Sequence, residues 1–391
     1  MFRIGLVGIG KMGISHLAIA RSHPGLECVA VCDSQAFLLA GARSHLHLDA
    51  YKSFDEMVAS ARLDGVVVST PTSSHTRLAR AALEHGLAVF VEKPLTLRAE
   101  ESRALAQLAE RRGLANQVGY HNRFVGTFRE LRRLVQAGAI GRIHHVDGRA
   151  FGPVVTRPAG AGRTWRTKKA EGGGCLHDYA CHVIDLMNFV KGPPAEVVGS
   201  RTTRIHSAQV EDAVHAMFEY GDGATGMLET NWSDESYRKM TTAVTVYGTR
   251  GKVFADRQEI GLFLDSGSTF EKFESGWTVR YITELQEPVA YYLRGEEYSA
   301  QLDAFADALS GRPHAHASTF ASAAETDAVV EEILALDGSL PTERRRRADA
   351  EPCIPSTDEL LQAARLYARA RGAAARRRMA DELRRFKERR A

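Results

Sequence analysis

The sequence predicts two domains: a doubly wound parallel α/β sheet over residues 1–122, then an α+β domain with a mostly antiparallel open sheet over residues 123–340. In the first part, short β-branched apolar runs alternate with amphipathic stretches of helix length, which is typical of parallel strands joined by helical crossovers. In the second part, alternating runs follow one another through turns such as Tyr220-Gly221-Asp222-Gly223, which is typical of hairpins. A chain of 391 residues is long enough to bury two separate cores.

The first domain contains apolar runs of strand length and, between them, stretches with apolar residues at helical spacing. We expect the strands at Phe2–Val7, Leu26–Cys32, Gly65–Ser69, Ala88–Val91 and Asn116–Gly119. We expect the helices at Met12–Arg21, Phe37–Ser44, Phe54–Ala61, Ser74–His85 and Ala99–Arg112. Parallel strands need crossovers of this size, so the pattern predicts one wound sheet.

The second domain begins with a predicted helix at Phe128–Ala137 and continues as strands. These strands are expected at Arg142–Phe151, Ala195–His206, Ala213–Tyr220, Ala224–Asn231, Thr242–Tyr247 and Gly251–Ala255. Two helices, at Ser299–Leu309 and Phe320–Leu336, are expected to close the domain near Asp337-Gly338. Residues 341–391 are predicted to be a basic linker and C-terminal helical extension, rich in Ala and Arg.

The charge balance argues against nucleic acid or a membrane as the main partner, because the net charge is only +3. The positive excess lies in residues 343–391, which we interpret as a helix packing on its own body or on a sister subunit rather than as a nucleic-acid arm. The start of the chain shows no secretory leader, so we expect a cytoplasmic protein. An odd number of cysteines, five, predicts free thiols rather than a disulfide framework.

The first strand is followed directly by Gly8-Ile9-Gly10-Lys11-Met12-Gly13, which fits the G-x-G-x-x-G pattern of a Rossmann dinucleotide site. Gly8 permits the tight turn, Gly10 lets the backbone approach a pyrophosphate, and Gly13 lets helix and strand pack closely. Lys11 and Met12 stand in the first turn of the helix, whose free N–H groups and dipole favour a phosphate. These residues are therefore predicted to bind the cofactor.

Asp33 bears on which dinucleotide is bound, NAD or NADP. It ends the second strand, where a carboxylate accepts hydrogen bonds from the ribose hydroxyls of NAD. The same carboxylate would repel the 2′-phosphate of NADP, and no arginine follows at once to offset it. We therefore predict NAD over NADP; the alternative is an ordinary turn residue at a strand end.

Three further segments resemble signatures of the Gfo/Idh/MocA family of sugar and cyclitol dehydrogenases, which includes inositol and glucose-fructose enzymes. They are Thr70-Pro71-Thr72-Ser73-Ser74-His75, then Glu92-Lys93-Pro94, then the run from Gly172-Gly173-Gly174 to Asp185. The resemblance covers about residues 2–340, with the segments in the family's order. The sequence departs from the family at Ala180, where glycine is usual, which puts the local geometry near Tyr179 in doubt.

Alcohol oxidation needs a base for the hydroxyl proton, and histidine titrates near neutral pH. Asp178 and His182, at i and i+4, are expected on one helix face. Lys93 follows a parallel strand, at the sheet edge where ligands bind, and its ammonium can stabilise negative charge on oxygen. The resemblance implies that His182 is the general base and that Asp178 binds substrate hydroxyls or orients the imidazole. Pro94 is predicted to shape the loop through a cis Lys-Pro bond.

The resemblance also implies a wider set of contacts. Cofactor contacts are expected from Thr70, Pro71, His75, Glu92, Lys93 and Asn122. Substrate contacts are expected from Lys93, Tyr120, Trp165, Arg166, Asp178 and His182, with the substrate a polyol or an anionic sugar. Arg123, in the same segment as Tyr120, is equally well explained as a structural ion-pair partner.

The cluster Cys175, His177, Asp178, Cys181 and His182 also admits a zinc site, but its spacing is unusual for zinc ligands, so we expect no metal. The sequence thus predicts an NAD-dependent dehydrogenase acting on a secondary hydroxyl. Two alternatives stay open: an NAD-bound enzyme that uses transient oxidation for elimination or glycoside cleavage, and a non-catalytic NAD-sensing regulator. The family resemblance also implies a homodimer or homotetramer that contacts its partner through the open sheet.

Overall fold

A computed structural model describes residues 1–156, 165–289, 291–312 and 314–337. The chain divides into two compact units, Met1–Gly338 and Ser339–Ala391. The predicted basic extension over 341–391 therefore lies outside the described residues. Among the described helices, none combines the length and the apolarity that crossing a membrane would require.

The first sheet is parallel and six-stranded, in the order β3-β2-β1-β4-β5-β6, as a doubly wound fold requires. All five predicted strands are present. The sequence did not predict β3, because a run of only three residues carries too little periodicity to be recognised. The strands are β1 (Phe2–Val7), β2 (Leu26–Cys32), β3 (Asp49–Tyr51), β4 (Gly65–Val68), β5 (Ala88–Val91) and β6 (Asn116–Val118).

Helices cover both faces of this sheet, so its central strands are buried on both sides. One face packs against α1 (Lys11–Ser22) and α2 (Ala36–Leu46); the other packs against α3 (Phe54–Ser60), α4 (His75–Glu84) and α5 (Ala99–Arg112). The first face also receives α9 (Glu296–Leu309), which buries Leu302 and Phe305 there. A helix late in the sequence thus completes the core of the first sheet.

The second sheet has eight strands in the order β14-β13-β12-β11-β7-β10-β9-β8, and every neighbouring pair is antiparallel except β7 with β10. The prediction of a mostly antiparallel sheet is confirmed. The sequence analysis did not identify β13 and β14, which form an additional hairpin at one edge. The strands are β7 (Ile143–Phe151), β8 (Glu196–Thr203), β9 (Ala213–Glu219), β10 (Thr225–Asn231), β11 (Ala243–Gly248), β12 (Gly251–Asp256), β13 (Glu259–Leu264) and β14 (Gly276–Tyr281).

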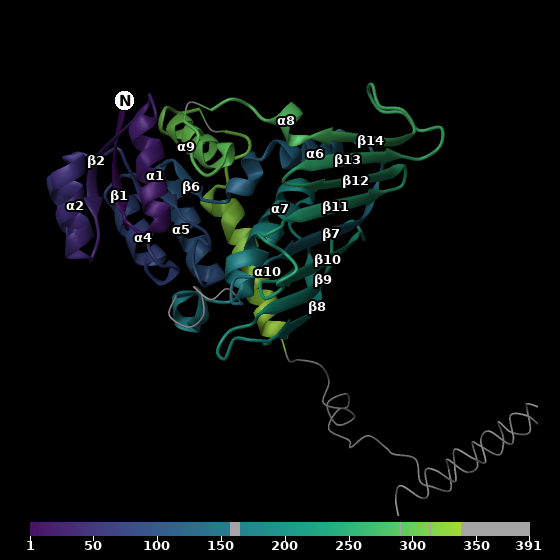
Figure 1. Cartoon of the computed structure of the whole chain (residues 1–391), viewed down its shortest axis with the longest axis horizontal. Coiled ribbons are helices and arrows are strands. Elements are labelled where there is room, and N and C mark those ends of the chain that lie inside the picture. Colours follow the sequence, from purple (N-terminus) through teal and green to yellow (C-terminus); the bar gives the residue numbers. More distant parts are fainter. Residues whose placement is uncertain (157–164, 290, 313, 338–391) are drawn as a thin grey trace, which may run out of the picture. The chain divides into compact units, whose positions relative to one another are not determined.

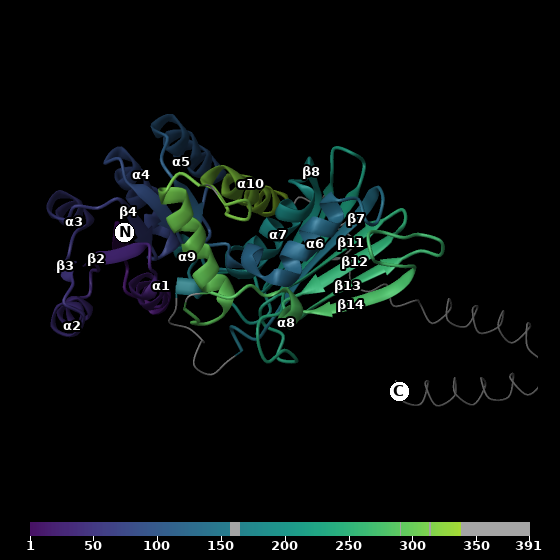
Figure 2. The same cartoon turned by 90° about the horizontal axis from the view of Figure 1, so that it is seen from above.

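One face of this sheet packs against helices α6 (Gly126–Gln136), α7 (Cys181–Lys191) and α10 (Phe320–Leu336), which lie on the same side of it in both views (Figures 1 and 2). A short helix, α8 (Ile282–Leu285), follows β14. Alternation along β9 shows the two environments: Val214 and Phe218 are buried, whereas Met217 is 54% exposed. The opposite face of the sheet is therefore open.

Candidate functional site

The turn between β1 and α1 has the geometry that its glycines predict. Gly8 has a φ of 89°, which side chains rarely adopt, and a Cβ at Gly13 would collide with the Gly8 carbonyl oxygen. Gly10 instead faces open space, with no atom within 4 Å of where its Cβ would lie. No side chain caps α1, so the N–H groups of its first turn, which includes Lys11 and Met12, can bind an anion. The turn therefore fits a dinucleotide pyrophosphate.

Asp33 follows β2 and contacts the same turn. Its Oδ2 accepts a hydrogen bond from the Ile9 N–H at 2.6 Å, and its Oδ1 accepts one from the Gln35 N–H at 2.8 Å. The carboxylate is only half-buried, so it is also accessible from the side of the turn. The glycine turn and the predicted ribose ligand therefore lie together.

His75 is fully enclosed rather than open to a ligand. Its Nδ1 lies 3.0 Å from the Pro94 carbonyl oxygen, and its Nε2 lies 2.9 Å from the Thr70 carbonyl oxygen. Both ring nitrogens therefore contact the protein backbone, and the ring ties the Thr70-Pro71 turn to the loop after β5. Among these residues Pro71 is exposed and Thr70 is half-buried, so the turn itself can reach a cofactor.

The loop after β5 carries Glu92 and Lys93, and the Lys93-Pro94 bond is cis, as predicted. Glu92 Oε1 lies 2.6 Å from His16 Nε2, and its Oε2 accepts a 3.3 Å hydrogen bond from the Lys93 N–H. Burial alone would raise the pKa of Glu92, but the hydrogen bond with His16 and the nearby charges lower it below its usual value. Glu92 is therefore ionised and orients the backbone at Lys93.

Asp178 receives two cations. The Lys93 ammonium donates to Asp178 Oδ1 and to its carbonyl oxygen, both at 3.0 Å, and Arg166 Nε donates to Oδ2 at 2.8 Å. Burial opposes ionisation of this carboxyl, yet Lys93 and Arg166 lower its pKa to about 2. The structure therefore brings together three predicted site residues from distant parts of the sequence.

The prediction that Asp178 and His182 project from one α-helix needs a correction. Residues Leu176–Ala180 (η5) form a π-helical turn, and α7 begins only at Cys181, whose N–H donates to the Leu176 carbonyl five residues earlier. A π-turn inserts one extra residue into a helix and is frequent at functional sites. Ala180, the departure from the family pattern, is fully buried inside this turn.

His182 is 5% exposed and lies in an aromatic environment. Its ring centroid is 5.8 Å from that of Tyr120 and 5.0 Å from that of His121, both edge-on. Burial, followed by the positive charges of Lys93 and Arg257, lowers the pKa of His182 well below its usual value. The imidazole is therefore neutral near pH 7, in the form that accepts a proton.

Sequence reasoning missed two residues beside His182. His121 stacks on Tyr298 with ring centroids 4.5 Å apart, and Arg257 donates to the Asn122 side-chain oxygen at 2.8 Å. Arg257 also pairs with Glu297, which begins α9. These contacts join residues that are distant in the sequence, and α9 adds Tyr298 and Glu297 to them.

Arg123 makes a buried two-pronged ion pair with Asp185, at 2.8 and 2.7 Å, so it is a structural residue. The four described cysteines are free thiols, as expected. Across the described ranges, no group of three or more His, Cys, Asp or Glu side chains is placed to hold a metal ion.

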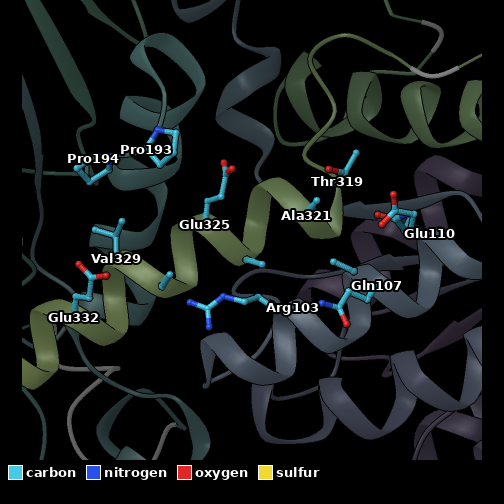
Figure 3. Close-up of a pocket in the computed structure, with 14 residues that line it drawn as sticks. Arg103, Gln107, Glu110, Pro193, Pro194, Thr319, Ala321, Glu325, Val329 and Glu332 are labelled. Carbon is cyan, nitrogen blue, oxygen red and sulfur yellow. The ribbon is translucent and has the colours of Figure 1, made fainter. Parts of the chain in front are cut away.

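A cavity of about 730 Å³ lies elsewhere, between α5, α10 and the Pro193-Pro194 turn (Figure 3). None of the predicted site residues lines it. Acidic side chains such as Glu325 and Glu332 and the single base Arg103 surround an apolar floor, without the histidine and lysine of the Asp178 cluster. This cavity is therefore separate from the predicted site residues.

Comparisons with known proteins match both halves of the molecule. Residues 2–120 match a family described as an oxidoreductase family with an NAD-binding Rossmann fold. Residues 128–254 match the Gfo/Idh/MocA C-terminal domain.

Individual proteins are similar over most of their length. The rhizopine catabolism protein MocA of Rhizobium meliloti is 32% identical over 58% of this chain and 70% of its own length. The scyllo-inositol 2-dehydrogenase (NAD(+)) of Bacillus subtilis is 28% identical over 73% of this chain and 84% of its own length. A solved structure of GenD2 from gentamicin A biosynthesis, in complex with NAD, is 25% identical with a TM-score of 0.69 and covers 85% of this chain and 93% of that one.

Proposed function

This chain belongs to the Gfo/Idh/MocA family of NAD-dependent oxidoreductases, and from that premise we propose that it reversibly oxidises a secondary hydroxyl of a sugar, sugar derivative or cyclitol. One observation carries the proposal. The Lys93 ammonium, from the loop after a strand of the first sheet, contacts Asp178, which stands four residues before His182 in the second domain. This contact supports a site in which a cation from the first domain and a carboxylate and a histidine from the second act together.

NAD supplies the hydride acceptor when it is bound. The glycine turn supports binding of its pyrophosphate through Gly8, Gly10, Lys11, Met12 and Gly13, since Gly10 leaves the approach open. Asp33 would accept hydrogen bonds from the ribose hydroxyls, as its position after β2 supports. Thr70, Pro71, Glu92, Lys93 and Asn122 are proposed to contact the cofactor further along, with His75 holding the Thr70 turn.

In the proposed reaction His182 accepts the proton of the substrate hydroxyl as the carbon is oxidised. Its neutral imidazole suits this role. The Lys93 ammonium stabilises the negative charge that develops on the oxygen, and Asp178 fixes the position of that ammonium through two hydrogen bonds. Tyr120, Trp165 and Arg166 are proposed to complete the substrate site.

The test is a screen of sugars, inositols and sugar acids with NAD, following the absorbance of NADH. His182→Ala and Lys93→Ala should each lower kcat/KM by roughly a hundred- to ten-thousand-fold. His45→Ala, which removes an exposed histidine from α2, is the matched control and should change nothing. Substrate consumption without NADH would favour transient oxidation coupled to elimination, and NAD binding without any turnover would favour a regulator.

We also propose that the open face of the second sheet packs against another copy of the chain. Its exposed side chains include Met217, Met227 and Trp277. Exposed apolar side chains that gather on one face are a common mark of a protein–protein interface. Light scattering behind size-exclusion chromatography should give a dimer or tetramer, and Met217→Lys combined with Met227→Lys should shift it toward the monomer.

A further inference from the structure

The triple glycine holds a neighbouring segment directly against the Asp178 cluster. The Gly174 N–H donates to the Arg166 carbonyl at 3.0 Å, and the Gly173 N–H donates to the Lys168 carbonyl at 3.0 Å. A Cβ at Gly173 would collide with the Arg166 carbonyl oxygen, so no other residue type would allow this close approach. The position of Arg166 is therefore built into the fold by the glycines.

The Arg166 guanidinium is held in place, but its contact with Asp178 uses only part of its hydrogen-bonding capacity. It donates its Nε–H to Asp178, and its Cζ lies 4.8 Å from the centre of the Trp165 ring, which supports it from one side. The side chain is still 38% exposed. Asp178 takes only the Nε–H, so the four N–H groups of the two terminal nitrogens do not serve that carboxylate. A guanidinium presents such N–H pairs to a second carboxylate in a two-pronged contact.

Two cations, Lys93 and Arg166, share the carboxylate of Asp178. Lys93 also lies beside the ionised Glu92, whose pKa it helps to lower. Two acids close to the triple glycine have other partners: Glu171 pairs with Lys168 at 2.8 Å, and Glu211 accepts from the Leu176 N–H at 2.8 Å. Within the described residues, Asp178 is the one acid paired with Arg166. Arg166 therefore has no carboxylate of its own, and its exposed side can receive one from a ligand.

We propose that Arg166 is a specificity-determining residue and that the substrate carries a carboxylate, making it a sugar acid rather than a neutral sugar or cyclitol. This inference rests on the proposed function, since it concerns the same site. A carboxylate on the substrate binds the terminal N–H groups of Arg166 while the hydroxyl to be oxidised lies at His182 and Lys93. The substrate then supplies Arg166 with a carboxylate that it does not share with Lys93.

The experiment compares matched substrate pairs with NAD: D-glucuronate against D-glucose, and D-galacturonate against D-galactose, with myo-inositol as a further neutral compound. The acids should be oxidised with a kcat/KM about 10- to 100-fold higher than their neutral partners. Arg166→Gln should lower kcat/KM for the acids much more than for the neutral compounds, chiefly through a higher KM, and so remove most of that advantage. Lys168→Gln removes the neighbouring cation, which is paired with Glu171, and serves as the matched control that changes neither class.

Calorimetric titration of the enzyme–NADH complex with the same compounds tests the anion site at Arg166 independently of the proposed dehydrogenase activity. If the acids bind tightly, and Arg166→Gln abolishes this binding, the anion site stands even where no compound is oxidised, and only the proposed dehydrogenase activity fails. If neutral compounds bind and turn over as well as the acids, or if Arg166→Gln weakens both classes equally, the assignment of Arg166 is overturned while the dehydrogenase proposal stands.

Discussion

The glycine turn after β1 and the cluster around Asp178 are built in opposite ways. The turn consists largely of backbone groups and open space, and the carboxylate of Asp33 beside it is half-buried. The cluster consists of charged side chains: an almost fully buried carboxylate, an ammonium that is 13% exposed and a guanidinium that is 38% exposed. Steric fit therefore governs the first region, and charge pairing governs the second. Substitutions that change only side-chain volume should therefore affect the turn, and substitutions that change only charge should affect the cluster.

Removing the charge of Asp178 should cause the largest loss of stability. Asp178→Asn keeps the shape but leaves Lys93 buried without a counter-charge, which should cost about 3–5 kcal/mol in the free energy of unfolding, measured with urea. Asp307→Asn, which removes an exposed partner of Arg312, should cost less than about 1 kcal/mol. Similar losses in the two variants would mean that charge pairing does not govern the cluster.

The pH dependence of Asp178 has a definite sign. Its pKa in the folded chain, about 2, lies below the usual 3.8, so the folded state holds this proton less tightly than the unfolded state. The stabilisation is present above about pH 4 and is lost as the pH falls toward 2. The unfolding free energy of Asp178→Asn should therefore depend less on pH in this window than that of the unsubstituted chain.

Asp327 in α10 extends the comparison, because it is a buried carboxylate that pairs with no cation among the described residues. It accepts hydrogen bonds from the Ser102 hydroxyl at 2.7 Å and the Thr96 N–H at 3.3 Å, yet burial raises its pKa to about 7. Between about pH 4 and pH 7 the unfolded chain has released this proton and the folded chain retains it, so stability falls as the pH rises. Asp327→Asn should remove this slope and stabilise the protein at pH 8 by on the order of 3 kcal/mol.

Thermal unfolding at pH 5 and pH 8 checks the Asp327 prediction, with Asp307→Asn as the control at both values. An unchanged slope in Asp327→Asn would mean that the carboxyl is ionised in the folded protein. The contrast with Asp178, where cations lower the pKa, would then disappear.

The glycine turn should respond to volume instead. Gly13→Ala forces a Cβ against the Gly8 carbonyl and should cost about 1–3 kcal/mol, together with a loss of NAD binding. Gly10→Ala meets no protein atom, so its stability should stay within about 0.5 kcal/mol while the KM for NAD rises. Urea unfolding and NAD titration measure both quantities. Equal destabilisation by the two substitutions would contradict the distinct roles of these glycines.

The smallest expected effect concerns the carboxylate of Asp33 beside the turn. Asp33→Ser removes the carboxylate that would repel the 2′-phosphate of NADP, so the preference for NAD over NADP should fall by about tenfold. Turnover of one substrate with both dinucleotides under equal conditions measures it. A preference for NADP in the unsubstituted enzyme would contradict the role of Asp33.

Much of the fold could be predicted because its signals are local. The strands of the first sheet, apart from β3, and helix α5 follow from periodicity alone. The hairpin of β13 and β14 was missed, since Trp277 and Val279 lie on an open face where alternation with buried residues is weak. The π-turn at Leu176–Ala180 was also missed, because sequence spacing assumes the α-helical repeat.

The glycine turn, the position of Asp33 and the family signatures can be identified from the sequence alone, because each depends on residues that are close along the chain. That Lys93 and Arg166 share Asp178, and that α9 brings Glu297 and Tyr298 to Arg257 and His121, follows from packing in three dimensions. Charges act through space, so their pairing depends on packing between distant segments rather than on local spacing. That packing determines the charge of the site and, through it, the proposed choice of substrate.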